Sequence, residues 1–187
     1  MARLPLASTL LIAIGVIAGV VSLDPLAYSN ASADKLQIAP ELPRLPASAW
    51  LNSAPLTLAG LRGHPVLIEF WTFECANCRN TLAWMKHTQE QYGPKGLAIV
   101  AVHSPELDEE RDPAAVARAV RSLGITYPVL LDTEFRYWQA VNNRFWPAFY
   151  LLDPAGRVVA TRIGELHRGD GSADEFERSI AGLLARP

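Results

Sequence analysis

The sequence VLIEFWTFECANC at residues 66–78 contains both cysteines of this 187-residue chain, Cys75 and Cys78. Its first part, residues 66–71, is mostly apolar and rich in β-branched and aromatic side chains, which is typical of a buried strand. Residues 79–92 carry apolar side chains at roughly helical spacing until a Gly-Pro pair ends the pattern. The cysteines are therefore predicted to lie where a buried strand passes into a helix.

The close spacing of the cysteines indicates redox chemistry rather than a structural bridge. A disulfide restricts the unfolded chain more when it closes a longer loop, and one between Cys75 and Cys78 closes almost none. At a helix N-terminus the positive helix end stabilises the Cys75 thiolate, and Cys78 is near enough to resolve a mixed disulfide. A zinc site needs further ligands, but there is no second cysteine pair and the histidines are scattered. We therefore predict a dithiol–disulfide switch without metal or separate cofactor.

Composition favours one globular domain without a nucleic-acid partner. Half of the residues are hydrophobic, which is enough for a core, and the formal net charge is only -2. Residues 34–55 place several prolines among polar and small residues. This pattern predicts a tether that leads into an N-terminal edge element.

The first 33 residues carry the pattern of an export segment. Arg3 precedes an apolar run over residues 4–23, in which no charge occurs before Asp24. The run suits either a cleaved signal peptide, with residues 31–33 as a small-residue cleavage site, or a short membrane anchor. Both alternatives stay open, and both predict that the domain lies outside the cytoplasm.

Beyond the cysteine pair, predicted strands alternate with predicted helices. Strands are predicted at 97–103, 129–132, 148–153 and 157–163, and helices from Pro113, at 134–141 and from a capping box at residues 172–175. Such alternation predicts an α/β fold whose mixed central sheet is covered by helices on both faces.

Three features together resemble the thioredoxin superfamily: residues 66–78, the Trp-Pro pair at 146–147 and the turn at 153–156. Residues 71–82 are most similar to its extracytoplasmic TlpA/ResA/DipZ-like branch. The resemblance extends over residues 45–184. It implies a thioredoxin fold with the helix–strand insertion of the TlpA branch.

The implied fold gives domain boundaries and a set of reacting groups. The thioredoxin-like domain is expected over residues 56–187, with the insertion between Pro105 and Asp132. Cys75 is expected to be the nucleophile because it lies nearest the helix N-terminus, and Cys78 the buried resolving thiol. Glu69 lies in the buried strand, where burial should raise its pKa into a useful range. The resemblance implies that it accepts the proton of the resolving thiol.

The remaining expected site residues are aromatic, cyclic or charged. Pro147 precedes an apolar strand, which favours a cis peptide bond, and the resemblance places a cis-proline there, facing the disulfide. Trp146 is then expected to pair with an extended substrate segment, and Trp71 and Trp146 to form an apolar floor. Glu74 stands where thioredoxins usually have tryptophan, so its charge is expected to oppose thiolate formation at Cys75.

The predicted function is thiol–disulfide exchange outside the cytoplasm. The resemblance implies reduction of protein disulfides, with electrons from a membrane thiol transporter of the DsbD or CcdA type, for cytochrome c maturation or oxidative defence. Two alternatives stay open. Thr72 lies three residues before Cys75, as in a thiol peroxidase, although Ile68 replaces the proline of that signature. His103 with the cysteine pair could form a Sco-like copper site, although Sco cysteines are separated by three residues.

Overall fold

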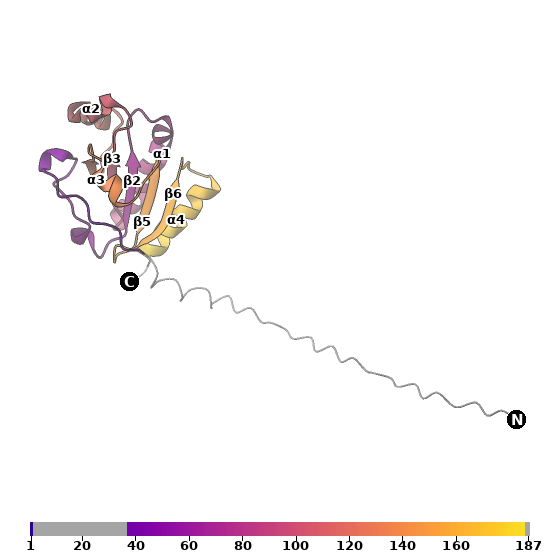
Figure 1. Ribbon diagram of the computed structural model, residues 1–187. Helices are drawn as coiled ribbons and strands as arrows, with labels where there is room; N and C mark the ends of the chain where they lie inside the picture. The colour runs from indigo at the N-terminus through magenta and orange to yellow at the C-terminus, as the bar shows by residue number, and fades with distance from the viewer. Residues whose placement is uncertain (2–36, 186–187) are drawn as a thin grey trace. The chain divides into compact units, whose positions relative to one another are not determined.

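The computed structural model describes Met1 and residues 37–185, and its centre is a six-stranded mixed sheet (Figure 1). The strands are β1 (Trp50–Leu51), β2 (Val66–Trp71), β3 (Ala98–His103), β4 (Val129–Leu131), β5 (Ala148–Leu152) and β6 (Val158–Ile163). Their order across the sheet is β1-β4-β3-β2-β5-β6. Strands β2, β3 and β4 are parallel, whereas β1, β5 and β6 pair antiparallel with their neighbours. The predicted mixed α/β sheet is thus confirmed.

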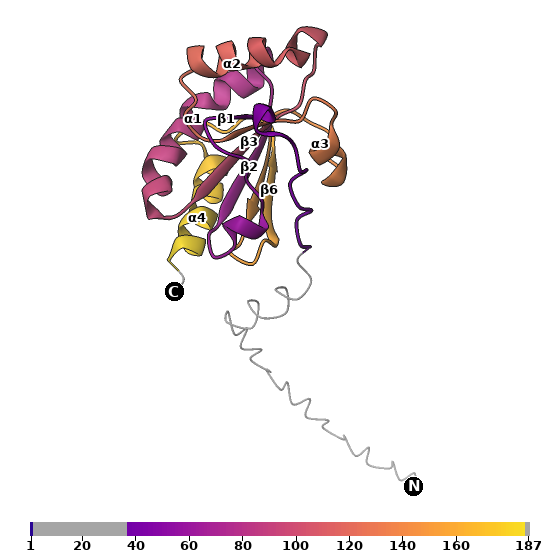
Figure 2. The same ribbon diagram turned by 90° about the vertical axis from the view of Figure 1, so that its left-hand side faces the viewer.

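Helices cover both faces of the sheet, and each face has its own core. The α-helices are α1 (Ala76–Tyr92), α2 (Pro113–Ser122), α3 (Arg136–Ala140) and α4 (Gly171–Leu184). Figure 2 shows α1 and α4 on one side of the sheet and α3 on the other. The larger core lies under α1, α2 and α4, and the smaller one under α3 and the segment that precedes β2.

Strand β2 lies in the middle of the sheet and is buried along its whole length. Successive side chains of a strand point to opposite faces. Leu67 and Trp71 accordingly belong to the core under α1, whereas Ile68 and Phe70 belong to the core under α3. Glu69 alternates with Ile68 and Phe70, so its carboxyl group lies on the α1 face, which is the face of the cysteine pair.

The predicted start of the last helix was wrong. Helix α4 begins at Gly171, and Asp170 caps it by accepting a hydrogen bond from the Ala173 backbone N–H at 2.6 Å. Ser172, expected to be the cap, instead donates its hydroxyl proton to Asp170 at 2.7 Å. The Asp170 carboxylate accepts hydrogen bonds from both groups, so α4 is capped two residues before the predicted position.

The described part of the N-terminal segment packs on the domain. Ile38 forms an isolated antiparallel bridge with Arg157, and Trp50 is buried at the start of the edge strand β1. The apolar run at residues 4–23 lies outside the described residues. Within residues 37–185, no helix has the length and apolar character that crossing a membrane requires.

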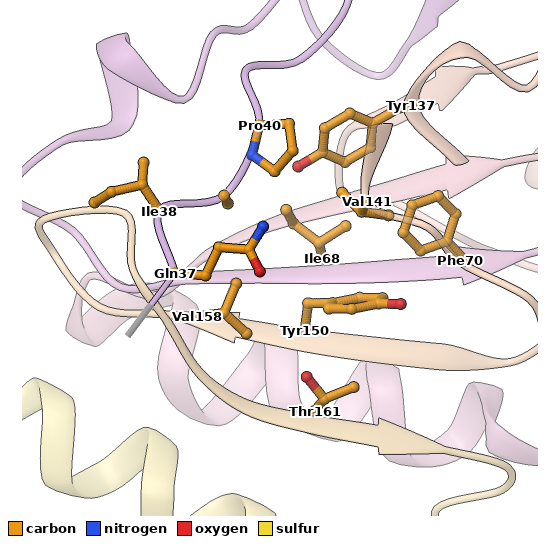
Figure 3. A pocket seen from close by; sticks show the side chains of 11 residues that line it. Gln37, Ile38, Pro40, Ile68, Phe70, Tyr137, Val141, Tyr150, Val158 and Thr161 are labelled. Atoms are coloured by element: carbon orange, nitrogen blue, oxygen red, sulfur yellow. The ribbon is translucent and has the colours of Figure 1, made fainter. Parts of the chain in front are cut away.

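An apolar pocket of about 260 Å³ opens on the α3 face of the sheet (Figure 3). Its walls come from the segment at residues 37–40, from β2, β5 and β6, and from α3. The buried Tyr137 hydroxyl in its wall has no hydrogen-bond partner. Neither cysteine nor Glu69 lines this pocket, so it is separate from the site described next.

Candidate active site

The two cysteines lie at the start of α1, and three residues separate the end of β2 from Cys75. Cys75 is the N-cap of the helix, with extended backbone angles, and its Sγ accepts a hydrogen bond from the Cys78 backbone N–H at 3.2 Å. Both residues are free thiols; Cys75 is partly exposed and Cys78 is buried. This is the arrangement that an attacking sulfur and a protected second sulfur require.

Burial controls the chemistry of Cys78. Removal from water raises the pKa of its thiol far above the ordinary value, and the hydrogen bond with Cys75 raises that pKa further. The backbone of Thr72 acts in the opposite direction but does not offset burial. Cys78 therefore stays protonated at neutral pH. It can react as a nucleophile only if a nearby group accepts its proton as the reaction proceeds.

Glu69 is the group in place to accept that proton. Its side chain is 3% exposed, and burial raises its pKa from 4.5 to about 8, although the hydroxyl of Tyr127 lowers it in part. The Oε2 atom of Glu69 is buried without a hydrogen-bond partner. Its charge also raises the pKa of Cys78, which shows that the two groups interact. A carboxyl group with a pKa near neutrality, on the same face of the sheet as a buried thiol, suits reversible proton transfer.

Pro147 directly precedes β5, the strand next to β2 in the sheet. The Trp146–Pro147 peptide bond is cis, as expected from the sequence. Trp146 is partly buried beside the core that also contacts Cys75, and its indole N–H donates to the Ser104 carbonyl at 3.0 Å. Trp146 also packs against Trp138, with ring centroids 4.3 Å apart. These contacts fix the ring, and its role in substrate binding stays a prediction.

Trp71 and Glu74 differ sharply in exposure. Trp71 is 4% exposed and lies in the core with its ring edge toward His103, a position that does not favour the expected contact with substrate. Glu74 is exposed, and its carboxylate lies 3.9 Å from Arg79 with both side chains half exposed. The negative charge that precedes Cys75 is thus partly balanced by a cation on the first turn of α1.

His103 approaches the site, as the sequence suggested, but in a buried and neutral form. Its ring stacks on Phe73 at 5.7 Å, and Nε2 lies 3.3 Å from the Thr72 hydroxyl. Burial lowers the pKa of His103 to about 4. Thr72 itself is fully buried, so its hydroxyl is not presented to peroxide as in the peroxidase interpretation.

Among residues 37–185, no cluster of three or more His, Cys, Asp or Glu side chains could hold a metal ion.

Glu110 belongs to the site although sequence reasoning did not single it out. It lies in the short 3-10 turn η5 (Asp108–Arg111), is 1% exposed, and accepts a hydrogen bond from the Glu74 backbone N–H at 2.9 Å. In the sequence it is one of several acidic residues in a run that resembles a solvated loop. No local pattern distinguishes the buried carboxylate from its exposed neighbours.

The model of the Redoxin family matches residues 41–179 of this chain. The chain belongs to the Redoxin family. Among curated proteins, it is similar to protein DipZ of Mycobacterium tuberculosis, with 37% identity over 155 residues, 79% of this chain and 22% of DipZ. This redoxin therefore spans about a fifth of that relative.

Other relatives are named for thiol–disulfide chemistry or for the thioredoxin fold. The thiol-disulfide oxidoreductase ResA of Bacillus subtilis is 29% identical over 115 residues, which is 62% of each chain. A thioredoxin-like protein solved in its oxidised form has a TM-score of 0.67 and 28% identity, covering 80% of this redoxin and 96% of that protein. This redoxin is thus similar to a thiol–disulfide oxidoreductase and to a thioredoxin-like protein.

Proposed function

We propose that this redoxin reduces disulfides in other proteins outside the cytoplasm. The observation that carries the proposal is the difference in exposure between the two sulfurs: Cys75 is partly exposed at the helix start, and Cys78 is buried. An exposed sulfur can reach a disulfide in a partner protein. The buried sulfur is shielded from the partner and is free to attack only the mixed disulfide.

The reaction is a two-electron exchange in two steps. The Cys75 thiolate attacks one sulfur of the substrate disulfide, the substrate S–S bond breaks, and the second substrate sulfur leaves as a thiolate. Glu69 then accepts the Cys78 proton, and the Cys78 thiolate attacks Cys75 in the mixed disulfide. The bond between Cys75 and the first substrate sulfur breaks, and that sulfur leaves as a thiolate. The substrate has then gained two electrons, and the redoxin holds a Cys75–Cys78 disulfide.

A new cycle needs an electron donor and a compartment where substrate disulfides persist. Protein disulfides are common outside the cytoplasm and rare within it. The apolar run at residues 4–23 supports export or anchoring there. A membrane thiol transporter of the DsbD or CcdA type is the proposed donor, since it could pass two electrons to the oxidised pair by the same exchange chemistry.

The reduction potential of the Cys75–Cys78 pair tests the direction of electron flow. For a reductant we expect a value near that of thioredoxin, about -270 mV, and not near that of DsbA, about -120 mV. The potential is measured by equilibration with glutathione buffers and mass spectrometry of alkylated thiols. A DsbA-like potential would mean that this redoxin oxidises its partners.

Removing the Glu74 charge should have only a small effect on Cys75. Glu74→Gln should speed alkylation of Cys75 by iodoacetamide about twofold, because repulsion of the thiolate is lost but exposed charges are screened by water and salt. Stopped-flow alkylation at low and high salt measures the effect, with Glu90→Gln on the far part of α1 as control. A rate equal to that of the control would leave Glu74 without a role in tuning the nucleophile.

Peroxide consumption and copper retention separate the two alternatives. A thiol peroxidase would oxidise its cysteines with hydrogen peroxide much faster than a free thiol does, and a copper protein would retain Cu(I) on desalting. We expect neither result, because the Thr72 hydroxyl is buried against His103.

A further inference from the structure

Glu110 is the one buried carboxylate of an otherwise exposed acidic turn. Within η5 its neighbours Asp108 and Glu109 are exposed, whereas Glu110 is 1% exposed. A carboxylate is costly to bury unless hydrogen bonds replace the water that it loses. The hydrogen bonds that Glu110 accepts therefore identify the backbone groups that it holds in place.

Both carboxylate oxygens of Glu110 accept backbone hydrogen bonds, and the donors come from two separate segments. Oε1 accepts from the Glu74 N–H at 2.9 Å, and Oε2 accepts from the N–H groups of Glu106 and Leu107 at 2.7 and 2.9 Å. Burial alone would raise the pKa of Glu110. The hydroxyl of Thr72 and these N–H groups outweigh burial and lower it, so the group is ionised at neutral pH.

The Glu74 end of this bridge lies next to the nucleophile. Residues 72–74 belong to neither β2 nor α1. The helix holds Cys75 through the Arg79 N–H, which donates to the Cys75 carbonyl at 3.1 Å, but not the residue before it. Cys75 must nevertheless keep N-cap geometry for its Sγ to accept the Cys78 N–H. The side-chain pair of Glu74 with Arg79 is half exposed and 3.9 Å long, which gives a weak restraint. The partly buried, charge-assisted hydrogen bond from the Glu74 N–H to the Glu110 carboxylate is a stronger one.

We propose that Glu110 is the positioning residue for Cys75. Its ionised carboxylate clamps the residue before the nucleophile to the loop at residues 104–111. The clamp holds the Cys75 sulfur over the N–H groups of the first turn of α1, where the thiolate is stabilised. The inference rests on thiol chemistry at Cys75 and is independent of which protein this redoxin reduces.

Glu110→Gln tests the clamp, because the amide keeps the shape but replaces one acceptor oxygen with a donor NH2 group. That group opposes a backbone N–H, so one end of the bridge should open. We expect the pH midpoint of Cys75 alkylation to rise by about one unit, which slows alkylation at neutral pH about tenfold. Loss of a negative charge alone would move the midpoint in the opposite direction. The sign of the shift thus distinguishes positioning from simple electrostatics.

Glu109→Gln is the matched control, since it removes the same charge from an exposed position in the same turn. Its midpoint should equal that of the unmodified protein. A Glu110→Gln midpoint that is unchanged or lower than that of the control would overturn the proposal. Because iodoacetamide replaces the protein substrate, this failure would leave the proposed reductase function standing.

Amide hydrogen exchange on the unmodified, reduced protein gives a test that needs no variant to fold. The clamp predicts that the Glu74 amide exchanges slowly, because it is held by a buried carboxylate, although it lies outside regular secondary structure. Exchange of this amide at the rate of an exposed loop would overturn the proposal.

Discussion

Replacing Cys78 with Ser should abolish multiple turnover and leave this redoxin covalently bound to its substrates through Cys75. The attacking sulfur remains at the helix start, where it is partly exposed. The hydroxyl that replaces the second thiol cannot displace a sulfur from the mixed disulfide. Activity with a protein disulfide should therefore fall by several orders of magnitude, as for removal of a group that acts as part of a catalytic unit.

Cys75→Ser is the paired variant that assigns the order of the sulfurs. It should also lose turnover but should trap few partners, because the remaining thiol is buried and its pKa is raised far above neutrality. Non-reducing gel electrophoresis after acid quenching measures the trapped complexes, and circular dichroism checks that both variants fold. Equal amounts of mixed disulfide in the two variants would contradict the assigned order.

The cysteine pair could be assigned from sequence because its signals are local. The buried strand, the helix and the Cys-Ala-Asn-Cys spacing lie within one continuous stretch, residues 66–92. Glu69 could be found for the same reason, since a carboxylate within an apolar strand is anomalous by itself. Its environment confirms that it is buried, at 3% exposure.

Features that depend on long-range contacts could not be found in this way. Glu110 contacts Glu74 across 36 positions, and only the folded chain distinguishes it from its exposed acidic neighbours. Trp71 was expected at the substrate surface. The strand pattern predicts which face of the sheet a side chain takes but not how deeply that side chain is buried. The predicted cap of α4 was wrong for a local reason. Asp170 and Ser172 are two candidates for the same helix end, and their hydrogen bonds decide between them.

Replacing Glu69 with Gln should slow resolution of the mixed disulfide about a hundredfold near neutral pH, because general base catalysis is lost while the shape is kept. The first attack by Cys75 should be almost unchanged. Rapid-mixing experiments with an insulin-derived disulfide peptide separate the two steps, since formation and decay of the mixed disulfide are followed by mass spectrometry.

Tyr127→Phe is the matched control for this variant. It keeps the carboxyl group but removes the hydroxyl whose hydrogen bond lowers the pKa of Glu69. The resolving step should then need a higher pH without being lost. If Glu69→Gln resolves the mixed disulfide as fast as the unmodified protein at every pH from 6 to 9, about the useful range around neutrality, Glu69 does not handle the proton.

Glu69→Gln should also change how the free energy of unfolding depends on pH, and the sign follows from the raised pKa of Glu69. Glu69 has a folded-state pKa of about 8 against an ordinary value of 4.5. Below 4.5 both folded and unfolded chains hold the proton, so burial of the carboxyl group costs little. Between the two values the unfolded chain releases the proton and the folded chain keeps it. The free energy of unfolding therefore decreases as pH rises through this window, by up to about 1.4 kcal/mol per unit.

Glu69→Gln cannot ionise, so its stability should lack this decrease. Relative to the unmodified protein, the variant should gain stability steadily from about pH 5 to about pH 8, by a few kcal/mol in total, and no further above that. Urea denaturation of the reduced proteins at several pH values measures the difference, and reduction removes any contribution from the disulfide. Parallel stability curves for the two proteins would show that Glu69 is ionised in the folded state throughout, and it could not then serve as a proton acceptor tuned to neutral pH.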